Sequence, residues 1–234
     1  MDRDAMKSVA AVAAVDEIES GMVVGLGTGS TAAHAVREVG RRLATGRLER
    51  ISAIPTSLET EKLAAEVLIP LIEPGTYPID VAIDGADEIA PDLALTKGGG
   101  GALLREKVIA AAARRFVVIA DDSKLVAALG SSFDIPIEVA RYGLRITTNE
   151  LERLGRPGLR SNEHGPFVTD NGNHIIDLAV DPIEDPTALE ASLQAIPGVL
   201  ATGLFIGIAD VAYVAGPGGI RRIEAASPAN IEGV

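Results

Sequence analysis

The segment Val81-Ala82-Ile83-Asp84-Gly85-Ala86-Asp87-Glu88 joins a short apolar run to a cluster of carboxylates. Its apolar part predicts a buried strand over residues 81–84, because it is short, rich in β-branched residues and followed by glycine. In open α/β sheets, ligands bind beyond the carboxyl ends of the strands. The two aspartates are therefore candidate ligand-binding or acid–base groups at such an edge. The alternative for a single Asp is a turn in which it caps the next segment.

Strand-like and helix-like segments alternate on both sides of this strand. The pattern predicts helices at 4–20, 31–43, 57–67 and 102–114, and strands at 22–26, 51–55 and 116–120. Such alternation indicates a parallel sheet covered by helices. The composition agrees, because 47% of the residues are hydrophobic and only 3% are aromatic, which leaves a core of Ala, Val, Ile and Leu.

The pattern changes after about residue 130. Strands are predicted at 135–139, 167–169, 175–180 and 199–204, and helices at 147–154 and 186–195. Asp170-Asn171-Gly172-Asn173 predicts a hairpin between the two middle strands. The order β-α-β-β-α-β is typical of a ferredoxin-like domain, and a strand at 210–215 returns to the first sheet. We expect an α/β chain in which residues 1–130 and 207–234 form a Rossmann-like parallel-sheet domain, and residues 131–206 form an inserted small ferredoxin-like α+β domain.

Charge and residue usage exclude several functions. The net charge is −12, from 33 acidic and 21 basic residues, so nucleic acid and anionic membranes would be repelled. The sequence has no cysteine, which excludes disulfides, thiolate catalysis and Cys-ligated metal sites. The first residues carry no signal-peptide pattern and no apolar run could span a membrane, so we expect a cytoplasmic protein.

A second candidate site is the loop Gly25-Leu26-Gly27-Thr28-Gly29-Ser30-Thr31 between a predicted strand and helix. Glycines there leave backbone N–H groups open, the helix N-terminus is partly positive, and three hydroxyls add donors, which suits a phosphate. The other interpretation is an ordinary turn with a Ser/Thr cap. The loop has neither the Gly-Lys-Ser/Thr ending of a nucleotide P-loop nor the glycine spacing of the dinucleotide fingerprint.

A third candidate is Lys97-Gly98-Gly99-Gly100-Gly101, which is followed by Arg105-Glu106-Lys107 in the first turns of a predicted helix. The glycines form either a flexible loop or a backbone held close to a ligand, and Lys97 at their edge favours the second. Glu106 alone would be a solvated helix charge, but beside this loop it is a candidate general base. Lys124 follows the apolar strand at 116–120, where a surface turn is the alternative. His34, His164 and His174 have no metal-ligand spacing, so we expect structural or exposed roles.

Together these motifs resemble the type A family of ribose-5-phosphate isomerase. The likeness extends from Lys7 to about Gly218. The segments that carry it are Gly-Leu-Gly-Thr-Gly-Ser-Thr (25–31), Asp-Gly-Ala-Asp-Glu-Ile (84–89), Lys-Gly-Gly-Gly-Gly-Ala-Leu (97–103), Arg-Glu-Lys (105–107), Ile-Ala-Asp-Asp-Ser-Lys (119–124), Val-Thr-Asp-Asn-Gly-Asn (168–173), Ile-Pro-Gly-Val (196–199) and Gly-Leu-Phe (203–205). The chain departs from the family at Asp122 and over 140–148.

The resemblance implies reversible isomerisation of D-ribose 5-phosphate to D-ribulose 5-phosphate in the pentose phosphate pathway, without a metal or organic cofactor. It implies that Glu106 is the base, that Asp84 opens the furanose ring with help from Asp87, and that Lys97 stabilises the enediolate. It also implies a substrate and phosphate site and a homodimer or homotetramer. The residues of that substrate site are Thr28, Gly29, Ser30, Thr31, Asp84, Gly85, Ala86, Asp87, Lys97, Gly98, Gly99, Gly100, Lys124 and Lys7.

Three other functions remain as alternatives. An amino-sugar phosphate deaminase or a lactonase on a related fold would need a different arrangement of His and Asp. A non-catalytic sugar-phosphate sensor would need a basic DNA-binding segment, for which there is no room before Met22. A Mg²⁺ phosphatase built on Asp84 and Asp87 would lose its activity in EDTA.

Overall fold

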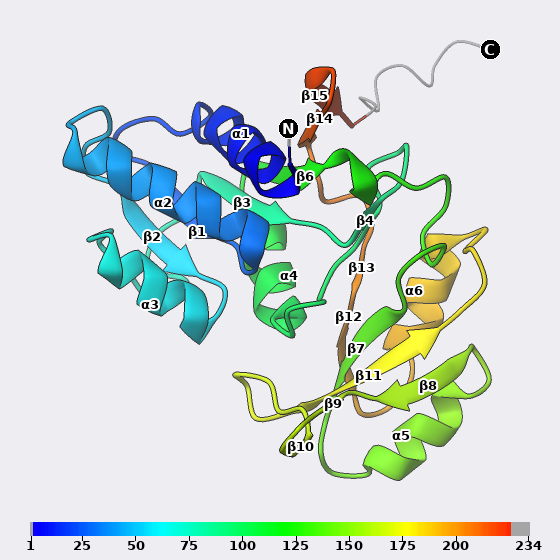
Figure 1. The fold of residues 1–234 in the computed structure, drawn as a ribbon. Coiled ribbons are helices and arrows are strands. Elements are labelled where there is room, and N and C mark those ends of the chain that lie inside the picture. The colour runs from blue at the N-terminus through cyan, green and yellow to red at the C-terminus, as the bar shows by residue number, and fades with distance from the viewer. Residues whose placement is uncertain (1, 226–234) are drawn as a thin grey trace.

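A six-stranded sheet forms the centre of the larger part of the molecule (Figure 1), and this computed structural model describes residues 2–225. Its order is β15-β14-β6-β3-β1-β2, and every neighbouring pair is parallel except β14 and β15. The strands of this main sheet are β1 (Val23–Leu26), β2 (Ser52–Pro55), β3 (Val81–Gly85), β6 (Phe116–Asp121), β14 (Val211–Gly216) and β15 (Gly219–Glu224). The chain leaves β1 to one side for β2 and then returns to the other side for β3. The strand order therefore reverses between β1 and β3, which is where α/β sheets bind ligands.

Apolar residues pack on both faces of the main sheet, as expected of buried parallel strands. In β3, Val81 and Ile83 face one core and Ala82 faces the other. The first core is covered by α1, α2 and α3, and the second by α4 and a small three-stranded sheet (Figure 1). The bounds of these helices are α1 (Arg3–Val15), α2 (Ser30–Ala44), α3 (Leu58–Glu66) and α4 (Leu103–Ala112), and the small sheet has the order β13 (Leu204–Phe205), β5 (Leu95–Thr96), β4 (Glu88–Ile89). The result is the Rossmann-like layer architecture that the sequence predicts.

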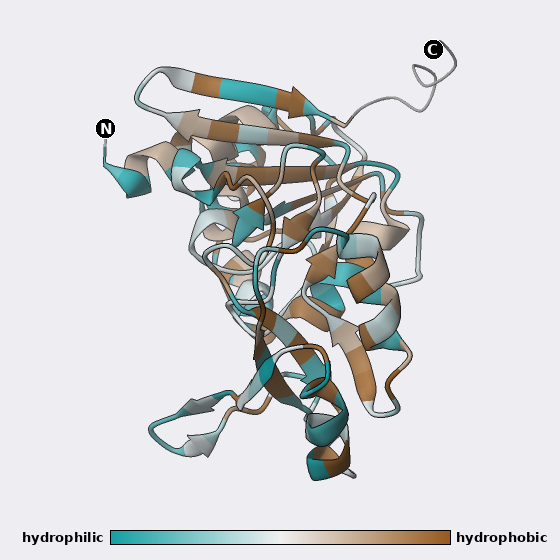
Figure 2. Ribbon diagram, turned by 90° about the vertical axis from the view of Figure 1, so that its right-hand side faces the viewer, coloured by the Kyte–Doolittle hydropathy of each residue, from teal (hydrophilic) through white to brown (hydrophobic). Residues whose placement is uncertain are grey.

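A second sheet of four strands, with two helices, forms what we call the small unit. Its order is β12-β7-β11-β8, and all neighbouring strands are antiparallel. Its elements are β7 (Ile135–Val139), α5 (Leu144–Leu151), β8 (Arg156–Leu159), β11 (His174–Ala179), α6 (Pro186–Gln194) and β12 (Val199–Thr202). This is the ferredoxin-like order β-α-β-β-α-β. A hydrophilic hairpin of β9 (Ser161–Asn162) and β10 (Gly165–Pro166) projects from it (Figure 2).

The strand predicted at 167–169 is wrong. Residues 156–159 form β8 and pair with β11 instead, and residues 167–169 have no strand partner. The Asn-Gly turn does form, because the N–H of Gly172 donates to the carbonyl of Thr169. The turn closes a loop and not a hairpin. Phe167, which the sequence pattern predicts in the first strand of the hairpin, packs instead against Leu103 and Ile175 in a separate apolar cluster.

Helix boundaries also differ from the prediction in two places. The first helix ends at Val15, because the chain turns there and Ile18 folds back into the core. The helix predicted at 147–154 is α5, which begins at Leu144 after a left-handed Gly143. A 3₁₀ turn, η1 (Asp122–Lys124), follows β6. The domain boundaries at 130/131 and 206/207 stay a prediction, and residues 226–234 of the first predicted domain lie outside the described residues.

No helix within residues 2–225 is long and apolar enough to cross a membrane.

Candidate active site

The loop after β1 lies against the carboxyl end of β3. A Cβ at Gly27 would lie 2.2 Å from Cγ of Asp84 and 2.6 Å from its Cα, so only glycine lets the two segments approach this closely. The N–H groups of Thr28 and Gly85 both donate to Oδ1 of Asp84, at 3.1 and 2.7 Å. The carboxylate of Asp84 thus joins β3 to the loop after β1, at the point where the strand order reverses.

Thr28 is held from its other side by hydroxyls. Its Oγ1 lies 2.7 Å from Oγ1 of Thr56 and 3.2 Å from Oγ1 of Thr60, and these two donate to the carbonyls of Leu26 and Gly27. The next residue, Gly29, has a φ of +102°, which suits glycine and turns the chain into α2. No side chain caps α2, so its first N–H groups remain open beside Ser30 and Thr31.

Lys97 follows β5 directly and reaches two carboxylates. Its Nζ lies 3.0 Å from Oδ2 of Asp84 and 3.5 Å from Oε2 of Glu106, and it donates to the carbonyl of Gly85 at 2.6 Å. All three side chains are almost fully buried. Glu106 lies in the first turn of α4, and its Oε2 is buried without a hydrogen-bond partner among the described residues.

This burial changes the proton affinities of the cluster. Burial, followed by the charge of Asp84, raises the pKa of Glu106 to about 8, although Lys97 opposes the shift. Burial also raises the pKa of Asp84, against the effect of Lys97 and of two backbone N–H groups. For Lys97, burial lowers the pKa, but Asp84 and Glu106 together raise it above its ordinary value. Burial thus favours the protonated form of both carboxyl groups, and Lys97 opposes this in each case.

Residues 98–101, which we call the glycine loop, follow Lys97 and lie against Asp87. The N–H of Gly99 donates to Oδ2 of Asp87 at 2.8 Å, and a Cβ at Gly99 would lie 2.8 Å from Oδ1. Gly98 and Gly101 have φ values of +105° and +83°, so the loop needs glycine at both ends. The glycine loop is thus held against Asp87 by a hydrogen bond and by close packing, and its role as a backbone close to a ligand stays a prediction.

A cavity of about 270 Å³ opens between these segments. Lys7 from α1 and Lys124 from η1 line it beside the N-terminus of α2, and Lys7 Nζ donates to Oγ of Ser30 at 2.9 Å. The cavity thus has cations and open N–H groups near α2, and carboxylates near Lys97. Its lining residues are Lys7, Thr28, Gly29, Ser30, Thr31, Gly85, Ala86, Asp87, Lys97, Gly98, Gly99, Gly100, Glu106 and Lys124.

The structure brings the residues predicted from the sequence to one place, with one qualification. Asp84 does not line this cavity and lies behind Lys97. The three histidines do not line it either. Sequence reasoning missed Gly27, Thr56 and Thr60, which position Thr28 and Asp84. Gly27 lies inside a motif that the sequence singles out, but the two threonines carry no such signal.

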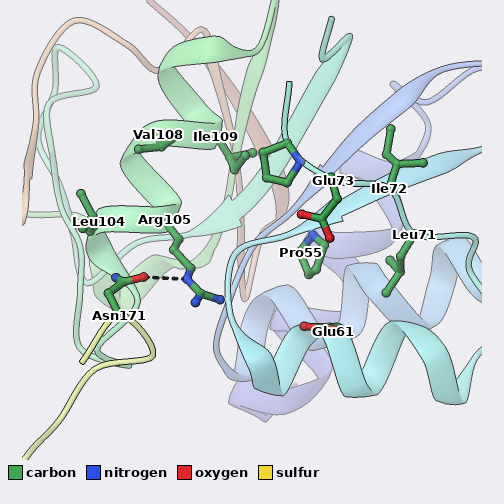
Figure 3. Close-up of a pocket in the computed structure, with 11 residues that line it drawn as sticks. Pro55, Glu61, Leu71, Ile72, Glu73, Leu104, Arg105, Val108, Ile109 and Asn171 are labelled. Atoms are coloured by element: carbon green, nitrogen blue, oxygen red, sulfur yellow. Dashed lines mark hydrogen bonds between the residues drawn. The ribbon is translucent and has the colours of Figure 1, made fainter. Parts of the chain in front are cut away.

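A larger cavity of about 590 Å³ lies between α4 and the segment that follows α3 (Figure 3). Leu104, Val108 and Ile109 line it from α4, with Leu71 and Ile72 opposite. Arg105 also faces it, but its Nε donates to Oδ1 of Asn171 at 2.9 Å. This cavity contains none of the predicted catalytic residues, and the candidate site is the smaller, charged one.

Comparison with known proteins identifies the family. The family model described as ribose 5-phosphate isomerase A (phosphoriboisomerase A) matches residues 52–219. The chain is 50% identical over 227 residues to ribose-5-phosphate isomerase A of Roseiflexus castenholzii, covering 96% of this chain and 97% of that protein. The chain belongs to the ribose-5-phosphate isomerase A family. The enzyme of Deinococcus radiodurans is 47% identical over 225 residues, covering 95% of this chain and 99% of that protein.

Solved structures of isomerases in this family have the same fold. A D-ribose-5-phosphate isomerase in complex with phospho-erythronic acid is 41% identical and superposes with a TM-score of 0.94, over 96% of this chain and 100% of the other. The enzyme of Methanocaldococcus jannaschii is 40% identical with a TM-score of 0.91, over 94% and 99%. In the described part of this chain, no three His, Cys, Asp or Glu side chains are grouped as a metal ion would require.

Proposed function

We propose that this isomerase interconverts D-ribose 5-phosphate and D-ribulose 5-phosphate through an enediolate, with Glu106 as the base. The reaction belongs to the pentose phosphate pathway. The observation that carries the assignment of the base is Oε2 of Glu106, a buried carboxylate oxygen without a hydrogen bond, in a residue that lines the charged cavity. Nζ of Lys97 lies 3.5 Å from this oxygen and does not hydrogen-bond it, so the carboxylate can accept a proton without losing a hydrogen bond.

The chemistry needs one base that serves two adjacent carbons. The carboxylate removes the proton from C2 of the open-chain aldose, the C2–H electron pair forms the C1–C2 double bond, and the enediolate oxygens take up negative charge. The carboxyl group then delivers a proton to C1 to give the ketose, after some of its protons have exchanged with solvent, while the hydroxyl proton moves from O2 to O1. A pKa of about 8 makes Glu106 a stronger base than an ordinary carboxylate once it is ionised.

Lys97 supplies the positive charge that the enediolate needs. Its Nζ lies 3.5 Å from Oε2 of Glu106, so an oxygen bonded to a carbon that reacts with Glu106 lies within its reach. Burial strengthens the interaction of the ammonium group with a developing oxyanion, because little water screens it. Asp84 holds this ammonium group in place at 3.0 Å.

Asp87 is the carboxylate that faces the sugar hydroxyls in this proposal. The resemblance gives ring opening to Asp84 with Asp87 assisting, but Asp87 lines the cavity and Asp84 lies behind Lys97. We therefore assign to Asp87 the direct exchange of hydroxyl protons during ring opening. Asp84 acts through Lys97, to which it is ion-paired.

The phosphate group is proposed to bind at the N-terminus of α2. The open N–H groups of that helix, the hydroxyls of Ser30 and Thr31, and the ammonium groups of Lys7 and Lys124 meet at that end of the cavity. A dianion is stabilised there by the helix dipole and by charge-assisted hydrogen bonds. Local positive charge at this end offsets the net charge of −12 of the whole chain.

The first experiment is proton NMR of ribose 5-phosphate in D₂O with EDTA, with wild type and Glu106→Gln side by side. Wild type is expected to form ribulose 5-phosphate with deuterium in the sugar. Glu106→Gln is expected to bind phospho-erythronic acid but to lose about 100- to 10,000-fold in kcat, the range found for removal of a general base. The exposed Glu152→Gln is the matched control and keeps wild-type turnover.

Near-normal turnover of Glu106→Gln would remove this residue from the base role. Binding without conversion by the wild type would indicate a sugar-phosphate sensor, and activity lost in EDTA would indicate a metal-dependent enzyme.

The proposal also includes a cytoplasmic homodimer or homotetramer. Tyr142, just before α5, and Ile146, in its first turn, are 96% and 72% exposed, which is unusual for side chains this large and suits a subunit contact. Analytical ultracentrifugation is expected to give at least twice the monomer mass for wild type and a lower mass for Tyr142→Asp. A monomeric wild type would contradict the oligomer.

A further inference from the structure

Arg160 connects the small unit to the glycine loop. It lies between β8 and β9, and these strands run below α4 in Figure 1. Its Nη1 donates to the carbonyls of Gly98 and Gly99, at 2.8 and 3.2 Å. Arg160 does not line the charged cavity, so it contacts the loop from behind.

The guanidinium group is itself held firmly. Its Nε donates to Oδ2 of Asp177 at 2.9 Å, and its Nη2 donates to Oδ1 of the same carboxylate. The group also lies 6.0 Å from the ring centre of Phe167, and the side chain is only 16% exposed. A two-pronged ion pair fixes the plane of a guanidinium group, so the remaining nitrogen has a defined direction.

The geometry of the peptide bond means that this contact also fixes the direction in which the N–H groups of the loop point. A trans peptide places its C=O and its N–H on opposite sides, and the described residues contain no cis peptide bond. With the Gly98 carbonyl turned toward Arg160, the N–H of Gly99 points the other way and donates to Asp87. With the Gly99 carbonyl also turned toward Arg160, the N–H of Gly100 points away from it. Gly99 and Gly100 both line the cavity.

The loop needs such an anchor because glycine does not choose between the two orientations of a peptide. Without a Cβ, positive and negative φ are about equally accessible, so an unanchored glycine peptide can rotate and reverse its N–H. Within residues 2–225, the N–H of Gly100 makes no protein hydrogen bond that would hold it. The Gly98 carbonyl also accepts the N–H of Gly101 at 3.0 Å, so the first peptide of the loop is held in part by the loop itself. The bond from Arg160 to the Gly99 carbonyl is the one that orients the N–H of Gly100.

We propose that Arg160, fixed by Asp177, is a positioning residue that directs the N–H groups of Gly99 and Gly100 into the active site. The Gly99 N–H orients Asp87, and the Gly100 N–H together with Lys97 forms the site for the negative charge of the enediolate. Preorganised N–H donors act most strongly on charge that develops in the transition state. Arg160 itself contacts no substrate. This inference rests on the proposed isomerisation and adds a residue to its machinery.

The test compares Arg160→Ala, Arg160→Lys and Asp177→Asn with Arg156→Ala, an exposed arginine on β8 that serves as the matched control. For Arg160→Ala, kcat is expected to fall about 10- to 100-fold with KM changed less than about three-fold, because the lost N–H donors act mainly in the transition state. Phospho-erythronic acid carries a planar carboxylate where the enediolate forms, so its Ki should weaken in parallel with kcat/KM. Arg156→Ala should match the wild type in each value.

Two further readouts separate positioning from general damage to the fold. Added guanidinium chloride at millimolar concentration should restore part of the activity of Arg160→Ala and none of that of Glu106→Gln. In the free enzyme, the amide ¹H–¹⁵N signals of Gly99 and Gly100 should shift in Arg160→Ala and stay in place in Arg156→Ala. Arg160→Lys keeps the charge but cannot bridge Asp177 and both carbonyls, so a folded Arg160→Lys should also lose kcat.

The inference is overturned if folded Arg160→Ala and Arg160→Lys keep wild-type kcat, or if kcat falls while the Ki of phospho-erythronic acid and the two amide signals do not change. Either result with an active wild type would leave the isomerisation and Glu106 untouched. An inactive wild type would instead contradict the proposed function, and the amide signals would still test the contact of Arg160 with the loop.

Discussion

Buried carboxylates in this molecule differ in the number of hydrogen bonds that they accept. Glu88 is fully buried, and its two oxygens accept bonds from Thr96, Gly130 and Ser132. It therefore fixes the chain between β4 and the start of the small unit. Glu106 is buried to a similar degree, yet its Oε2 has no such donor. A satisfied carboxylate stabilises a fold, and an unsatisfied one that lines a cavity is available for proton transfer.

With Glu106 as the proposed base, the pH dependence of the reaction follows from its ionisation. Burial raises its pKa to about 8, so the ionised form that accepts a proton grows as the pH rises toward that value. We expect kcat/KM, which reports ionisations of the free enzyme, to increase with pH up to about 8 and then level off. Steady-state kinetics between pH 5 and pH 9.5, with inhibitor binding as a check of integrity, measures this. A flat profile across pH 6–9 would contradict it.

At the scale of elements, the sequence predicts the main sheet well because its signals are local. Each parallel strand is a short apolar run, and its functional residues follow it directly, so one motif specifies both the element and the site. Asp84 near the carboxyl end of β3, Thr28 after β1 and Lys124 after β6 all come from this rule. The family resemblance then adds roles for these residues that periodicity alone leaves open.

The small unit is predicted less well because its pairing depends on distant contacts. β8, Arg-Pro-Gly-Leu, is mostly exposed and contains Pro and Gly, so it has none of the apolar alternation that indicates a strand. Phe-Val-Thr at 167–169 has that composition, yet Phe167 is used to fill the space beside Gly101, where a Cβ would lie 2.5 Å from its ring. The role of Arg160 could not be predicted for the same reason, since its partners in the glycine loop lie about sixty residues away in sequence.

The turn from β1 into α2 gives a prediction about close approach. In Gly27→Ala, the new Cβ would lie 2.2 Å from Cγ of Asp84 and 2.6 Å from its Cα. The Cα belongs to the backbone of β3 and cannot rotate away. The loop must shift, which should cost about 1–3 kcal/mol of unfolding free energy and displace the phosphate site. Urea unfolding and the KM for ribose 5-phosphate measure the two effects. Gly218→Ala is the control, since nothing lies within 4 Å of its Cβ, and equal stability of the two variants would refute the argument.

At the scale of the whole molecule, the active site depends on how the small unit sits against the main sheet. Besides the bond of Arg160 to the glycine loop, Oδ2 of Asp170 accepts the N–H of Leu58 at the start of α3, at 2.8 Å. Arg105, next to Glu106, donates to Asn171 and to the carbonyl of Asp170. Residues of the small unit thus hold both α3 and α4, and a shift of the small unit would move Glu106, the proposed base.

Lys107, one residue after Glu106, also links α4 to the small unit. Its Nζ donates to Oε1 of Glu190 and to the carbonyl of Leu204, both at 2.8 Å, and burial lowers its pKa. Lys107→Met keeps the length of the side chain but leaves Glu190 without its cation, so we expect a loss of about 2–3 kcal/mol in unfolding free energy. Urea unfolding of the two single variants and of Lys107→Met with Glu190→Leu measures the coupling between them. If this link sets the placement of Glu106, Lys107→Met also lowers kcat, while the exposed Lys62→Met does not. If the losses of unfolding free energy in Lys107→Met and Glu190→Leu simply add up in the double variant, the two side chains are not coupled and the link is refuted.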